Sequence, residues 1–151
     1  MRRFTLCLLA ALTAAPSVAP AFAQPAAPPH AWLFGTWTGG MFPAPSTMSP
    51  QACLSQPVVI FTRDLVMRAT LTEQVLTQRE IESARGVQGA AEFRFASVAP
   101  GSQFLNLGAA GAAGFGCENP DVLHVQRRGE NEIAFPGCAD FPNPLVRCHT
   151  R

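Results

Sequence analysis

Short runs of alternating apolar and polar residues, divided by proline and glycine, limit most strongly what this chain can fold into. In LVMRATLT (65–72) every second side chain is apolar: Leu65, Met67, Ala69 and Leu71. This period of two is typical of a strand with one buried face, because successive side chains of a strand point to opposite sides of the sheet. We therefore expect Met67 and Leu71 to point inward and Arg68 to face solvent.

Similar runs occur along much of the chain. We expect strands at 58–62, 65–72, 90–98, 102–108, 121–127, 132–136 and 145–148. The segment 73–85 also contains good helix formers, but Val75, Leu76 and Ile81 form no stripe at helical spacing, so we favour a strand there. Roughly seven to nine short strands with no long helical pattern predict an all-β fold, either a small antiparallel β-barrel or a β-sandwich.

The cysteine count indicates a domain cross-linked by two disulfides. Cys7 lies in the N-terminal apolar run, and four cysteines remain beyond it: Cys53, Cys117, Cys138 and Cys148. An even number of cysteines is typical of structural disulfides in exported proteins, and the spacings contain no CxxC pair for a metal. Cys117 and Cys138 flank an expected hairpin, so we prefer that pair, with Cys53 bridged to Cys148. The pairing of Cys53 with Cys117 and Cys138 with Cys148 stays open, because sequence does not fix connectivity.

The N-terminus has the three parts of a secretory signal peptide. Two arginines and an apolar run precede the A-x-A sequence at 21–23. We expect cleavage after Ala23, a flexible Pro/Ala-rich leader at 24–31, and a single β domain at 32–151 in the periplasm or secreted. The apolar run is shorter than the about 20 residues that span a bilayer, so we expect no transmembrane span in the mature chain.

Charge and motifs argue against several classes of function. Loss of Arg2 and Arg3 with the signal peptide leaves nine of the eleven basic residues against ten acidic ones, so we expect no nucleic-acid partner. The chain contains no G-x-S-x-G, H-E-x-x-H or G-x-G-x-x-G motif. His30 falls in the leader, and His124 alternates with apolar residues and should face solvent. We therefore expect no enzyme, no cofactor and no metal.

Gly35-Thr36-Trp37 opens the first structured segment of the mature chain. In this place the tripeptide resembles the lipocalin/calycin group, whose tryptophan closes one end of a β-barrel beneath an arginine from late in the chain. The resemblance implies that structural role for Trp37 and Arg147. It covers the tripeptide and the strand order alone, since this chain has no tyrosine for the group's Thr-Asp-Tyr motif and no C-terminal helix.

The first functional hypothesis is an exported, non-enzymatic barrel that encloses a small apolar or amphipathic ligand. Its interior would be lined by Met67, Leu71, Phe93 and Phe95. Arg79 would share the inward face with Val75 and Ile81, where a guanidinium needs an anionic partner, so it could orient a polar group of the ligand.

The second hypothesis is a periplasmic interaction or protease-inhibitor-type protein. The small bacterial inhibitors of secreted metalloproteases are similar in outline, with a short Gly-x-Trp barrel behind an N-terminal arm, here residues 24–31. Their single short-loop disulfide is not matched by these four cysteines. Interior volume discriminates between the hypotheses, because bulky side chains that fill the barrel argue against a ligand carrier.

Overall fold

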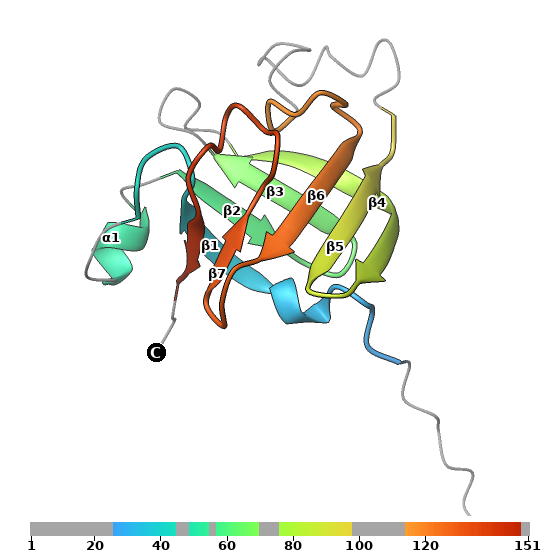
Figure 1. Cartoon of the computed structure of the whole chain (residues 1–151), viewed down its shortest axis with the longest axis horizontal. Helices are drawn as coiled ribbons and strands as arrows, with labels where there is room; N and C mark the ends of the chain where they lie inside the picture. Colours follow the sequence, from blue (N-terminus) through green and yellow to red (C-terminus); the bar gives the residue numbers. More distant parts are fainter. Residues whose placement is uncertain (1–25, 45–48, 55–56, 70–75, 98–113, 149–151) are drawn as a thin grey trace, which may run out of the picture.

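The computed structural model describes residues 26–44, 49–54, 57–69, 76–97 and 114–148. In this part of the chain, eight strands close into one antiparallel barrel (Figure 1). Each strand pairs with the strands that precede and follow it in the sequence, and the last strand pairs with the first. The strands are β1 (Gly35–Gly39), β2 (Val58–Phe61), β3 (Leu65–Ala69), β4 (Thr77–Val87), β5 (Ala90–Phe95), β6 (Val122–Arg127), β7 (Glu132–Ala134) and β8 (Leu145–Arg147). The all-β prediction is confirmed, and the architecture is the barrel rather than the sandwich.

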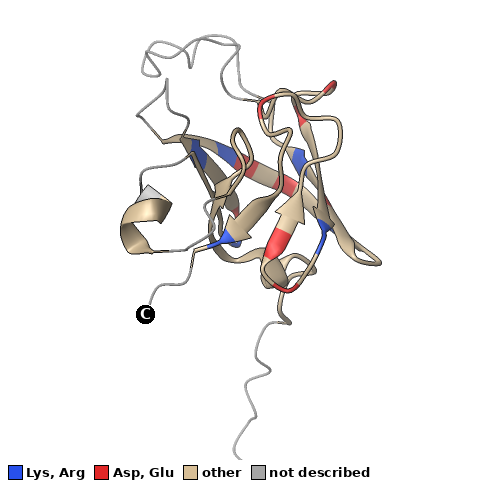
Figure 2. Ribbon diagram, turned by 60° about the vertical axis from the view of Figure 1, so that its left-hand side comes forward, with Lys and Arg blue, Asp and Glu red and all other residues tan. Residues whose placement is uncertain are grey.

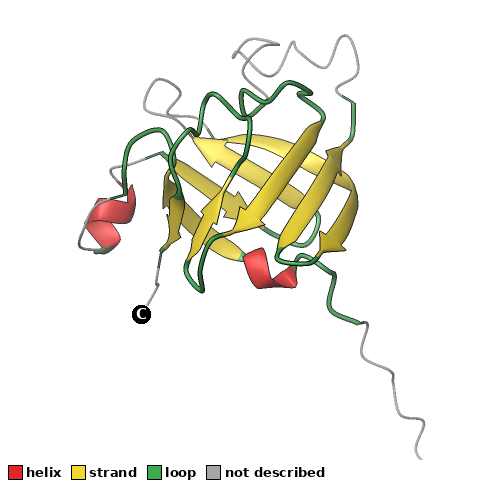
Figure 3. Ribbon diagram, viewed as in Figure 1, coloured by secondary structure: helices red, strands yellow, loops and turns green. Residues whose placement is uncertain are grey.

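Two short helices accompany the barrel. The 3-10 helix η1 (Ala31–Leu33) precedes β1, and α1 (Pro50–Leu54) lies outside the barrel in the connection from β1 to β2 (Figure 3). Within the described ranges, no helix has the length and hydropathy needed to cross a membrane.

Successive connections alternate between the two ends of the barrel. We call the end that carries η1 the η1 end; it also holds the tight turns at 62–64, 88–89 and 128–131. The opposite end, the loop end, carries the long connections that include residues 40–44, 49–54, 114–121 and 135–144. The arm that precedes η1 leaves the molecule from the η1 end, as the blue trace in Figure 1 shows.

The ambiguous segment forms part of a long strand. β4 runs from Thr77 to Val87 and carries a bulge between Ile81 and Ser83, where its pairing with β5 shifts by one residue. A bulge changes which side chains face inward, so no single alternating pattern holds along the strand. Leu71 and the strand expected at 102–108 lie outside the described residues.

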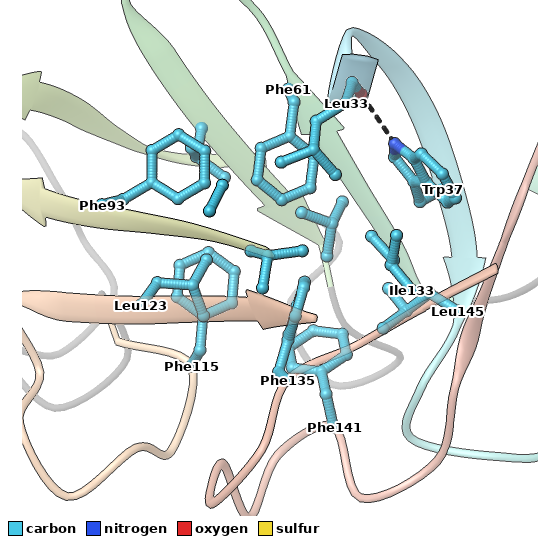
Figure 4. Close-up of a cluster of buried hydrophobic side chains, with 14 of the residues drawn as sticks. Leu33, Trp37, Phe61, Phe93, Phe115, Leu123, Ile133, Phe135, Phe141 and Leu145 are labelled. Atoms are coloured by element: carbon cyan, nitrogen blue, oxygen red, sulfur yellow. Dashed lines mark hydrogen bonds between the residues drawn. The ribbon is translucent and has the colours of Figure 1, made fainter. Parts of the chain in front are cut away.

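The buried core lies inside the barrel and is rich in aromatic rings (Figure 4). Strands contribute ten of its fully buried side chains: Trp37, Val59, Phe61, Val66, Phe93, Phe95, Leu123, Val125, Ile133 and Leu145. Three further phenylalanines enter from connections at the loop end, namely Phe115, Phe135 and Phe141. The barrel is therefore filled partly by side chains that belong to no strand.

The predicted faces of β3 are wrong. Val66 and Arg68 are buried, whereas Met67 is half-buried. The face of β3 that points into the barrel is therefore the one with Val66 and Arg68, which we expected to face solvent. The reason is an ion pair, since Arg68 Nη1 donates to Asp140 Oδ2 at 2.8 Å. A buried guanidinium is tolerated when it is paired and hydrogen-bonded.

Two disulfides cross-link the barrel, in the pairing preferred from the sequence. Cys53 in α1 is bonded to Cys148 after β8, and Cys117 is bonded to Cys138 between two loop-end connections. The first bridge joins α1 to the end of the last strand, and the second holds residues 114–121 against residues 135–144. Disulfides indicate an extracellular or otherwise oxidising compartment.

Candidate functional site

The barrel interior is occupied by its own side chains. Phe93, on β5, lies 5.6 Å from Phe61 and 6.4 Å from Phe95, measured between ring centroids, and Phe95 lies 6.0 Å from Phe115. These spacings are those of packed aromatic pairs. Phe93 and Phe95 do point inward as expected, but in the described part of the barrel they fill the space that an enclosed ligand requires.

Two surface hollows border this core from outside, since Phe135 and Phe141 line the larger and Cys138 lines both. The larger, of about 710 Å³, runs along residues 134–144 and includes several prolines in its lining. The smaller, of about 320 Å³, lies beside the outer face of β6 and includes His124. Met67 lies on the outer side of β3 and reaches neither the core nor these hollows.

Arg79 lies on β4 near the loop end with its side chain only 5% exposed. Its Nη2 donates to Asp121 Oδ1 at 2.5 Å and to the Ala96 carbonyl at 3.3 Å, while Nη1 donates to the Pro120 carbonyl at 3.1 Å. The guanidinium also lies 5.0 Å above the Phe95 ring. The inward orientation expected for Arg79 is what the structure has, with the anionic partner supplied by the protein itself.

Arg79 and Arg68 thus fasten the loop end to the barrel. Arg68 lies 5.8 Å from the Phe115 ring and pairs with Asp140, so each arginine joins a strand to one of the two connections linked by Cys117–Cys138. The guanidiniums complete a packed closure at this end rather than presenting donors to an open cavity.

Breaking the Arg79 pair from its two sides should give unequal losses of stability. We expect Asp121→Ala to lower the free energy of unfolding by about 2 kcal/mol, because it leaves a buried guanidinium without its carboxylate. Arg79→Met should cost about half as much, because Asp121 is 43% exposed and can be hydrated once it is free. Urea unfolding of both variants and the double variant measures this. Equal losses would contradict the assignment of Arg79 as the desolvated partner.

The η1 end is closed by Trp37 and Arg147. The Trp37 ring is fully buried and its Nε1 donates to the Leu33 carbonyl at 2.8 Å, the dashed line in Figure 4. The Arg147 guanidinium lies 4.3 Å above that ring, and its Nη1 donates to the Phe34 carbonyl at 2.7 Å. This is the arrangement that the lipocalin/calycin resemblance implied for these two residues.

His30 fixes the arm to the same end of the barrel. It is 3% exposed, its ring lies 5.3 Å from Phe34 and 5.1 Å from Phe93, and its Nε2 donates to the Arg63 carbonyl at 3.0 Å. The expectation that His30 belongs to a loose leader is therefore wrong, because its ring is part of the packing that closes the η1 end. Ordered structure begins before the expected boundary at Trp32.

A second arginine–tryptophan pair at the η1 end was not expected from the sequence. The Arg127 guanidinium, at the end of β6, lies 5.0 Å above the Trp32 ring. Arg147 contacts the same residue, because its Nη2 donates to the Trp32 carbonyl. Burial and the neighbouring charge of Arg127 both lower the pKa of Arg147.

The remaining polar groups of interest lie on the outer face of the barrel. His124 is exposed, as expected, and its Nδ1 lies 3.6 Å from Glu92 Oε2 on the outer face of β5 and β6. Among the described residues, no group of three or more His, Cys, Asp or Glu side chains could hold a metal ion. Charged positions are interspersed over the ribbon in Figure 2 rather than gathered by sign.

Comparison with known proteins includes a distant likeness to a solved structure. No protein-family model and no curated protein matches the chain. The structure is similar to the crystal structure of Treponema pallidum Tp0751 (Pallilysin), with a TM-score of 0.47 and 12% sequence identity, over 80% of this chain and 84% of that one. A closed eight-stranded antiparallel barrel fits a calycin-like barrel in general.

Proposed function

We propose that this chain is an exported, non-enzymatic protein-binding module, in which a rigid lipocalin-like barrel holds an N-terminal arm for another protein. The observation that carries the proposal is the filled interior. Phenylalanines from strands and loops pack inside the barrel, and both ends are fastened by arginines. A barrel packed in this way favours presentation of its outer surface over enclosure of a small apolar ligand.

The attachment of the arm supports the same function. His30 anchors the arm in the core, whereas Ala26, Ala27 and Pro29 just before it are exposed. Pro28 and Pro29 restrict the backbone to extended conformations. Such an arm loses less conformational freedom on binding than an unanchored peptide, which favours its use in an interface.

Export accords with the signal-peptide pattern and with the two disulfides. Cleavage after Ala23 would leave Gln24 as the first residue and the arm at the mature N-terminus. The arm would then be free to enter a cleft of its partner, as the outline shared with the periplasmic protease inhibitors suggests.

Native mass spectrometry of the mature protein isolated from its own cells tests the proposal. We expect a complex with a second polypeptide and no stoichiometric small molecule. Deletion of residues 24–27, which leaves Pro28 and Pro29 in place, should abolish the complex while changing the free energy of unfolding by less than about 0.5 kcal/mol. Phe42→Ala, at an exposed position of the loop end, serves as the control and should keep the complex.

Two results would overturn the proposal. A small apolar molecule bound in a one-to-one ratio would favour the ligand carrier instead. If the chain is isolated after cross-linking without any protein partner, the proposed protein-binding function is wrong.

A further inference from the structure

At the η1 end, the two guanidiniums that stack on tryptophans have no carboxylate partner in the described structure. Arg127 stacks on Trp32 and Arg147 stacks on Trp37, and the second arginine donates only to backbone carbonyls. Asp64 and Glu130 lie on neighbouring turns of this end, but neither forms an ion pair with these arginines within the described residues.

The two ends of the barrel therefore differ in charge compensation. At the loop end, Arg68 and Arg79 are each paired with an aspartate. At the η1 end, the charge of Arg127 adds to burial in lowering the pKa of Arg147, so the two cations disfavour one another. An external carboxylate placed between them would stabilise both charges.

An exposed apolar residue lies in the hairpin that contacts Arg127. Val87, at the tip of the β4–β5 hairpin, is 59% exposed, and Arg127 N donates to the carbonyl of Gly89 in the same turn at 2.9 Å. The arm passes beside this hairpin, since a Cβ built on Gly86 would lie 3.1 Å from Pro29 Cβ. We call Pro29, Trp32, Val87, Arg127 and Arg147 the arm-root surface.

We propose that the arm-root surface binds a protein segment that presents a carboxylate side chain beside an apolar one. The inference rests on the proposed protein-binding function and names the surface and the chemistry of its partner. Charge complementarity carries it, because the uncompensated guanidiniums match an acidic group, and tryptophan and arginine are the residue types that dominate binding energy in interfaces.

An anionic membrane is the less favoured occupant of this surface. Membrane attraction of this kind takes clusters of basic residues at about 1 kcal/mol each. The arm-root surface has two arginines, and the mature chain has more acidic than basic residues.

Site-specific photocrosslinking in the producing cells tests the inference on the full chain. The cross-linker p-benzoylphenylalanine is placed at Val87 and, as the matched position at the loop end, at Phe42, which is also an exposed apolar residue. Each is combined with Arg127→Glu, with Arg127→Gln, and with the control Arg128→Glu, which makes the same charge change at the adjacent exposed residue.

The expected result is a protein adduct from position 87, with none from position 42. Arg127→Glu should reduce its yield about tenfold and Arg127→Gln about threefold, whereas Arg128→Glu should leave it within about twofold. The cross-linked peptide of the partner should contain Asp or Glu within about four residues of the linkage, which is one helical turn. A far-UV circular dichroism melt of each variant excludes a loss caused by unfolding.

The alternative results separate the two proposals. A protein adduct from position 42 alone, or one from position 87 that Arg127→Glu leaves unchanged, would overturn the arm-root surface while keeping the protein-binding function. A lipid adduct at position 87 would overturn the choice of a protein occupant. If neither position gives an adduct, both the surface and the proposed function fail.

Discussion

Trp37→Ala should lower the free energy of unfolding by about 3–5 kcal/mol, a loss typical of removing a large buried aromatic side chain. The substitution removes a fully buried ring, its hydrogen bond to the Leu33 carbonyl and the surface on which Arg147 stacks. Arg147 would then keep its charge in a partly desolvated place without the ring beneath it. Urea unfolding followed by far-UV circular dichroism measures the change.

Trp32→Ala is the matched control for this prediction. Trp32 packs only partly against the core and stacks on Arg127, which is exposed, so its removal should cost about 1 kcal/mol. The Trp32 carbonyl that accepts from Arg147 is kept in the variant. Equal losses for the two tryptophans would show that Trp37 has no special part in closing the η1 end.

The strands were predictable because their signal is local. Alternation over a few residues identified most of β2 to β8, and the four cysteines with their flanking elements favoured the pairing that the structure has. The strand inference required no knowledge of a residue far along the chain. The short helix α1 was missed, because its sequence PQACL follows a proline-rich loop and has no amphipathic pattern at this length.

The faces of β3 could not be read in the same way. Leu65 and Met67 are as apolar as Val66, so the polar residues Arg68, Thr70 and Thr72 decided the prediction, which is wrong for Arg68. Its burial depends on Asp140, which is 72 residues away in the sequence. A pairing over that distance leaves no mark in a window of eight residues, and the same holds for Arg79 and Asp121.

The filled interior was also beyond local pattern. Phe115 and Phe141 lie in no expected strand, and Phe135, expected inside the strand 132–136, follows the end of β7, so alternation did not show that the three rings meet. Their places follow from the closed barrel, whose loop end they fill, and from the disulfide that brings residues 117 and 138 together. Interior volume is the property that discriminates between the functional hypotheses, and the sequence could not supply its value.

Of the two arginine–tryptophan pairs at the η1 end, one could be predicted from the sequence and the other could not. The Trp37–Arg147 pair was suggested by the resemblance of Gly35-Thr36-Trp37 to the lipocalin/calycin group. The Trp32–Arg127 pair had no such guide, because Trp32 stood at the expected edge of a flexible leader and Arg127 at the end of a strand. Trp32 follows His30 by two residues, and the burial of His30 that anchors the arm could not be read from this spacing.

Removing the Cys53–Cys148 disulfide should destabilise the protein more than removing Cys117–Cys138. The first bridge closes a loop with a sequence separation of 95 residues and the second one of 21 residues. In the chain-entropy account, the longer loop restricts the unfolded chain more, so we expect losses of about 5 and about 3 kcal/mol. Replacing both cysteines of each pair with serine avoids a free thiol, and guanidinium unfolding without reductant compares the two variants.

A reversed order of these losses would carry its own physical meaning. The Cys117–Cys138 bridge holds the connections that carry Phe115 and Phe141, which fill the loop end, and Asp121 and Asp140, which pair with the buried arginines. If its removal were the more costly, the native packing of those side chains would outweigh the entropy of the unfolded chain. Arg68→Met in the 117/138 serine background separates the two causes. If the connection that carries Asp140 has already left the barrel in this background, Arg68→Met should lower the free energy of unfolding by less than it does in the parent protein; if the connection is still in place, the two losses should be equal.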